Sequence, residues 1–127
     1  RFLGELTIRL TDLVESERPD ELLLLGDRAE MLAGAIVGTY LGIPTFHVHG
    51  GDVSSTVDEH ARHAITKLSH YHLAATERSA ERVRRLGEEE WRIHVVGSPS
   101  LDDVLSMSKM TDEELSRYEL APSEDSS

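Results

Sequence analysis

The sequence of 127 residues contains no cysteine and only two lysines, Lys67 and Lys109. The absence of cysteine excludes disulfide bonds and thiolate metal sites, and it suits a reducing compartment, so we expect a cytoplasmic protein. No stretch approaches the roughly 18 consecutive apolar residues of a membrane-spanning helix, so we expect no membrane segment. Residues 1–10 also lack the basic-then-apolar pattern of a signal peptide.

Positive charge is scarce, because 13 Lys and Arg residues stand against 24 Asp and Glu residues and give a formal net charge of −11. A domain this acidic repels nucleic acid phosphates, so the composition argues against DNA or RNA as a partner. The length fits one domain, and a chain of this size buries enough surface to hold its own core.

Helical and strand patterns alternate along the chain. Helical spacing, capping residues and glycines predict helices over 2–17, 28–41, 57–68, 77–86 and 100–107, and short apolar runs predict strands over 22–25, 45–48, 71–75 and 93–96. The unbroken leucine run at 22–25 is typical of a strand buried on both faces. Strands separated by such helices form right-handed crossovers, so we predict an α/β fold with one parallel sheet.

Polar residues of both signs follow the predicted strands. They are Asp27 and Arg28 after the first strand, His49, Gly50, Gly51 and Asp52 after the second, Thr76 and Glu77 after the third, and Gly97 and Ser98 after the fourth, with Asp58, Glu59, Arg62 and His63 added by the helix after the second strand. In open parallel sheets, ligands bind beyond the carboxyl ends of the strands. We therefore expect these residues to converge on one edge.

Some of these acids also have a structural interpretation. Asp27 precedes a helix and Glu30 follows three residues later, which is typical of an N-cap. Asp58 and Glu59 lie in the first turn of a helix, where the dipole favours carboxylates. Thr56 and Glu59 form a capping box, which leaves Asp58 without a capping role.

Histidines and glycines also permit two interpretations. The histidine pairs at 47 and 49, 60 and 63, and 70 and 72 suggest a metal, but their spacing matches no zinc signature and imidazoles also serve as ordinary hydrogen-bonding groups, so we expect no metal. Gly50 and Gly51 either form a tight turn or let backbone N–H groups approach an anion. The stretch holds neither a GxGxxG nor a Walker loop.

Three separated motifs resemble one family when they are taken together. They are Gly26-Asp27-Arg28-x-Glu30, His47-x-His49-Gly50-Gly51-Asp52, and Asp58-Glu59-x-x-Arg62-His63-x-Ile65-Thr66-Lys67-x-Ser69-His70. Over residues 19–104 the chain is similar to the UDP-N-acetylglucosamine 2-epimerases, particularly the hydrolysing branch of sialic acid synthesis. Thr76-Glu77 and Val96-Gly97-Ser98-Pro99 also fit that family.

The resemblance implies a two-domain, GT-B-like enzyme that binds its UDP-sugar substrate between the domains, needs no cofactor and forms homo-oligomers. Residues 1–106 would be part of the Rossmann-like N-terminal domain, a parallel sheet with helices on both faces. Residues 107–127, which are acidic and polar, would be a linker or tail toward a C-terminal domain that the chain does not include. The chain would then be a fragment.

The family reaction begins with loss of UDP from C1 and of a proton from C2, which leaves a 2-acetamidoglucal. Water then adds and releases N-acetylmannosamine, whereas the non-hydrolysing branch re-adds UDP. The resemblance implies that Asp27, Asp52 and Asp58 are the catalytic carboxylates, with their individual roles left open. Residues around the sugar nucleotide would be Arg28, His49, Gly50, Gly51, Arg62, His63 and Ser98.

One position departs from the family pattern, because Asp52 stands where the hydrolysing branch usually has glutamate. Aspartate is one methylene shorter, and a displacement of about 1 Å can alter catalysis. This leaves open a related branch that acts on UDP-diacetamido-trideoxy sugars. A non-catalytic remnant or binding module of the same fold is a further alternative. A glycosyltransferase of the same architecture is disfavoured because those enzymes lack the aspartate and histidine motifs.

Overall fold

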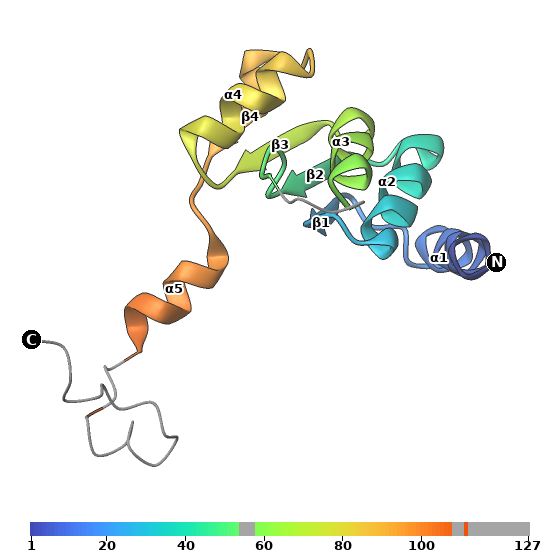
Figure 1. The fold of residues 1–127 in the computed structure, drawn as a ribbon. Helices are drawn as coiled ribbons and strands as arrows, with labels where there is room; N and C mark the ends of the chain where they lie inside the picture. Colours follow the sequence, from blue (N-terminus) through green and yellow to red (C-terminus); the bar gives the residue numbers. More distant parts are fainter. Residues whose placement is uncertain (54–57, 108–110, 112–127) are drawn as a thin grey trace, which may run out of the picture.

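The computed structural model describes residues 1–53, 58–107 and 111. The elements, in chain order, are α1 (Phe2–Glu17), β1 (Leu22–Leu25), α2 (Ala29–Leu41), β2 (Thr45–Val48), α3 (Asp58–Leu68), β3 (Tyr71–Ala74), α4 (Glu77–Arg85), the 3₁₀ turn η1 (Glu90–Arg92), β4 (Ile93–Val95) and α5 (Pro99–Ser106). The four strands form one parallel sheet in the order β1-β2-β3-β4 (Figure 1). The predicted α/β class and element order are confirmed, with boundaries within one residue; only η1 was not predicted.

Local signals in the sequence fix several of the element ends. Gly42 ends α2 with a left-handed backbone angle φ of 70°. The Thr76 hydroxyl accepts the Ser79 amide and caps the start of α4. The predicted capping box at Thr56 and the predicted tail after Met107 lie outside the described residues, apart from residue 111.

The crossover helices pack on one face of the sheet. Leu24, His47, His72 and Ile93 are cross-strand partners, so their side chains share that face. Leu24 packs against α2 and α3, and Ile93 packs against α4. α1 lies beside α2, next to the β1 edge of the sheet (Figure 1).

The opposite face is more open. Leu23 and Leu25 are 69% and 56% exposed, and Phe46 stacks on Tyr71 with ring centroids 4.6 Å apart. The expectations of helices on both faces and of a first strand buried on both faces are therefore not met within the described residues. The reason is topological: each right-handed crossover to the next strand in the same direction places its helix on the same side.

No helix in the described part of the chain is both long and apolar enough to span a membrane.

Candidate functional site

The carboxyl ends of the four strands meet at one edge of the sheet, where the predicted polar residues begin. The amides of Gly26, His49 and Val96 each donate to a carbonyl on the neighbouring strand, at 2.9–3.1 Å, just beyond the strand ends. The loops after β1, β2 and β4 therefore leave the sheet side by side. The backbone at the strand ends therefore lies along one edge of the sheet, as predicted.

Asp27 does not cap a helix. The N-cap position of α2 is Arg28, whose side chain makes no capping bond. The Asp27 carboxylate instead accepts a hydrogen bond from Nη2 of Arg62 on α3. Both side chains are largely buried, with 19% and 10% exposure. The N-cap interpretation of Asp27 is therefore wrong, and a tertiary ion pair takes its place.

The same arginine retains capacity for another acceptor. Nε and Nη1 of Arg62 are buried and have no hydrogen-bond partner among the residues that the structure describes. Buried N–H groups without a partner are costly, so such donors favour an anionic or carbonyl ligand. Arg62 thus holds Asp27 with one nitrogen, while its other two nitrogens are buried with their hydrogen-bonding capacity unused by the described residues.

Arg28 and Asp58 line an open hollow of about 370 Å³, together with Phe2, Ala29 and Glu30. Arg28 is exposed and pairs with Glu30 at 3.3 Å, and this hydrogen bond lowers the pKa of Glu30. Asp58 is the first residue of α3. The hollow thus presents both signs of charge to solvent beside the carboxyl end of β1.

A second cluster lies after β2. His49 Nδ1 is 2.9 Å from Asp52 Oδ2, and the Ser79 hydroxyl donates to Asp52 Oδ1 at 2.6 Å. The hydroxyl of Ser98, from the loop after β4, lies 3.4 Å from His49 Nε2. Three of the strand ends therefore contribute to one chain of polar groups.

The two glycines between His49 and Asp52 allow close packing. A Cβ on Gly51, where φ is +78°, would lie 2.1 Å from the Ser79 carbonyl oxygen. A Cβ on Gly50 would lie 3.1 Å from His47 Nδ1. Arg82 on α4 donates to the Gly51 carbonyl at 3.0 Å. The glycines serve packing, and their contact with an anion stays a prediction.

His47 stabilises the strand ends at the site through two side-chain hydrogen bonds. Its Nε2 lies 2.8 Å from the Gly26 carbonyl oxygen, and its Nδ1 lies 3.1 Å from the Thr66 hydroxyl. Burial lowers the pKa of His47 to about 4, so the ring is neutral near pH 7. A neutral ring has one N–H, which donates to the carbonyl, while Nδ1 accepts from the hydroxyl. His47 thus joins the ends of β1 and β2 to α3.

His63 contributes less directly. It is half-buried next to Arg62 on α3, and its Nε2 lies 3.8 Å from a carboxylate oxygen of Glu59, one turn earlier. Its Nδ1 is buried and has no hydrogen-bond partner in the described part of the chain. Among the described residues, no group of three histidines and acids is arranged to hold a metal ion.

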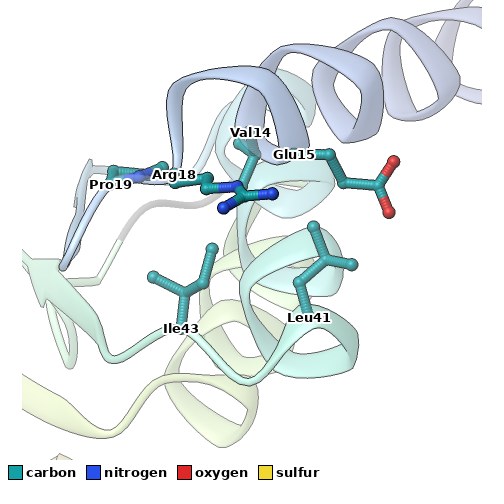
Figure 2. A pocket seen from close by; sticks show the side chains of 6 residues that line it. All are labelled: Val14, Glu15, Arg18, Pro19, Leu41 and Ile43. Carbon is teal, nitrogen blue, oxygen red and sulfur yellow. The ribbon is translucent and has the colours of Figure 1, made fainter.

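A hollow of about 540 Å³ lies elsewhere (Figure 2). Its lining residues are Val14, Glu15, Arg18, Pro19, Leu41 and Ile43. They precede β1 and β2, so the hollow borders the amino ends of the strands. It contains none of the predicted site residues, and we assign the site by its chemistry rather than by volume.

Sequence reasoning missed Ser79. This residue is 3% exposed and holds Asp52 from the first turn of α4. The Thr76-x-x-Ser79 spacing is typical of a helix start, and that signal could have directed attention to it. Its bond to Asp52, 27 positions away in sequence, depends on tertiary structure.

Comparisons of this chain with known proteins point to a single family. Residues 1–125 match the sequence model of the family described as UDP-N-acetylglucosamine 2-epimerase. The chain is 51% identical over 111 residues to a UDP-N,N'-diacetylbacillosamine 2-epimerase (hydrolyzing) of Legionella pneumophila, covering 87% of this chain and 29% of that protein. It is 44% identical over 110 residues to a UDP-N-acetylglucosamine 2-epimerase of Neisseria meningitidis serogroup B, covering 87% and 28%.

A solved structure from the same family also resembles this chain. The crystal structure of a UDP-GlcNAc 2-epimerase of Methanocaldococcus jannaschii, in complex with UDP-GlcNAc and UDP, superposes with a TM-score of 0.77 and 33% identity. The match covers 81% of this chain and 29% of that one. The chain therefore spans less than a third of the length of these relatives.

Proposed function

Because the chain belongs to the UDP-N-acetylglucosamine 2-epimerase family, we propose that it forms the N-terminal part of the active site of a UDP-sugar 2-epimerase. The hydrolysing reaction is preferred: UDP-N-acetylglucosamine and water give UDP and N-acetylmannosamine through a 2-acetamidoglucal. The observation that carries the proposal is the buried ion pair of Asp27 and Arg62 at the strand edge, with two further Arg62 nitrogens that have no partner within residues 1–53 and 58–107.

The chemistry needs a group that accepts the C2 proton and groups that stabilise the departing UDP oxygen. Asp27, Asp52 and Asp58 supply carboxylates beside the strand ends, and Arg62 and Arg28 supply positive charge. Arg62 is the better candidate for an oxyanion, because a buried guanidinium acts in a low-dielectric setting. Arg28 is exposed, so solvent weakens its interactions.

A second substrate class has support. Asp52 replaces the glutamate usual in the hydrolysing branch, and the Legionella relative is named for UDP-N,N'-diacetylbacillosamine. We therefore propose that UDP-diacetamido-trideoxy sugars be tested beside UDP-N-acetylglucosamine. Hydrolysis of either sugar supports a hydrolysing 2-epimerase, and the ratio of the two kcat/KM values assigns the substrate.

The test uses the full-length gene product that carries this chain, with both UDP-sugars, and measures UDP release and the free sugar. Asp27→Asn should lower kcat by about 100-fold or more, since it removes the charge that Arg62 holds. Asp20→Asn, a change at an exposed position before β1, is the matched control and should stay within about twofold.

Two outcomes contradict the proposal. Failure of the unaltered full-length protein to release UDP or to form an epimer from either sugar refutes the epimerase, and binding of the sugar without turnover then favours a binding module. Full activity in Asp27→Asn, with the fold intact, removes Asp27 from the catalytic set.

A further inference from the structure

We propose that His49, rather than Asp52, takes up the proton at the start of turnover, and that Asp52 and Ser79 act as positioning residues that hold the imidazole. This inference rests on the proposed function and deepens it. It assigns a reacting atom, Nε2 of His49, at the edge where the loops after β2 and β4 meet.

Both oxygens of Asp52 are already engaged. Oδ1 accepts the Ser79 hydroxyl at 2.6 Å, and Oδ2 lies 2.9 Å from His49 Nδ1. A carboxylate held on both oxygens has a fixed orientation. Each oxygen keeps a second lone pair, but the two short bonds direct the carboxylate toward His49 and Ser79. Its geometry suits the orientation of a neighbour.

The imidazole is left with one open acceptor. In the neutral imidazole, a carboxylate at 2.9 Å places the hydrogen on Nδ1, and Nε2 then holds the lone pair. The only contact described for Nε2 is the Ser98 hydroxyl at 3.4 Å, near the limit for a hydrogen bond, and that hydroxyl also lies 2.8 Å from Ser100 Oγ. A resting state with a free acceptor suits the first step, which removes a proton.

The backbone at His49 has an uncommon conformation. His49 directly follows β2 and has a backbone φ of 66°, a left-handed conformation that residues other than glycine rarely adopt. Such conformations concentrate at functional sites, where the surrounding structure enforces them. Here Gly51 lies against the first turn of α4, which holds the loop in place.

Among the described residues, Asp52, Arg82 and His47 are charged or titratable groups near this cluster. Asp52 balances a positive imidazole directly. Arg82 reaches the loop through the Gly51 carbonyl, and His47, two residues before His49, is neutral and buried. The carboxylate is the group in contact with the ring, so it dominates the local field.

Nε2 of His49 accepts the C2 proton while the C1–O bond breaks, its electron pair leaves with UDP, and C1 and C2 become doubly bonded. Asp52 compensates the charge of the imidazolium. Water then adds a hydroxyl at C1 and a proton at C2 of the glycal, and the imidazolium returns its proton to solvent.

The first test compares His49→Gln with His94→Gln in the full-length protein. His94 is an exposed residue of β4, so its change should leave kcat within about twofold. His49→Gln should lower kcat about 100-fold or more with a small change in KM, since the proton acceptor is lost. A His49→Gln protein that keeps over a tenth of kcat overturns the inference.

The second test uses Asp52→Asn, which preserves shape and removes charge. The imidazole keeps an acceptor nitrogen, so turnover should fall only about 10- to 100-fold, with KM nearly unchanged because the lost group orients the imidazole rather than binding the sugar. Loss of turnover at every pH, with His49→Gln active, makes Asp52 the base and overturns the inference.

The third test concerns Ser79. Ser79→Ala should lower kcat about tenfold and leave KM nearly unchanged, since Asp52 loses one of its two anchors. Ser79→Cys, nearly isosteric and a weaker donor, should show a similar loss, and it decides the question if Ser79→Ala does not fold. Unchanged kcat in a folded variant of either kind overturns the positioning role.

The two levels of failure are distinct. An unaltered full-length protein that turns over neither UDP-sugar refutes the proposed function. An active protein whose His49→Gln variant is also active refutes only the assignment of the proton acceptor.

Discussion

Gly51 offers the sharpest test of the geometry after β2. A Cβ added there would lie 2.1 Å from the Ser79 carbonyl oxygen and 2.8 Å from its carbonyl carbon. Backbone atoms cannot rotate away, so the loop or α4 would have to move by about 1 Å, and overpacking of this kind costs about 1–3 kcal/mol. The left-handed φ of +78° adds about 1–2 kcal/mol for any L side chain.

Gly51→Ala should therefore lower the free energy of unfolding by about 3 kcal/mol, measured by urea denaturation of the chain with circular dichroism. Gly42→Ala is the matched control, because Gly42 has φ of +70° and nothing within 4 Å of its Cβ position. It should cost only about 1 kcal/mol, the conformational part alone. Equal losses in the two variants would show that the loop does not lie against α4 as described.

Three further predictions concern buried polar groups. The pKa of His47, about 4 when folded and 6.5 ordinarily, means that the unfolded chain binds more protons between these values. Stability should be full above about pH 6.5 and fall by about 2 kcal/mol between pH 7 and pH 5; His47→Gln should lack this part of the slope in urea titrations at both pH values. Glu88→Gln should cost about 2–3 kcal/mol by the same assay, because the buried carboxylate lies 3.0 Å from His72 and 2.6 Å from Lys67. Thr76→Ala should lower the melting temperature by several degrees, because loss of an N-cap costs about 1 kcal/mol.

The helices and strands followed from local patterns, because apolar spacing and capping are properties of neighbouring residues. The leucine run at 22–25 shows the limit of such reasoning. An unbroken apolar run predicted a strand buried on both faces, yet Leu23 and Leu25 are exposed. The sequence of a strand cannot show which of its faces the crossover helices cover, because that depends on the direction in which the following strands are added.

Asp27 shows the same limit within the site. Its position before a helix is compatible with an N-cap, and local sequence cannot separate that role from a tertiary one. In the structure, the Asp27 carboxylate accepts a hydrogen bond from Arg62, 35 residues later in the sequence. The role of Ser79 was not predicted for a related reason, since its hydroxyl donates a hydrogen bond to Asp52, which is distant in the sequence.

The amino-acid sequence by itself determined the α/β class, the order of the elements and the set of polar residues that follow the strands. It could do so because hydrophobic periodicity and turn chemistry act over a few residues. Only the tertiary structure decided that Asp27 pairs with Arg62, that His49, Asp52 and Ser79 form one chain of hydrogen bonds, and that the helices gather on one face. These outcomes depend on contacts between residues far apart in the chain, whose distances are set by the packing of helices on the sheet.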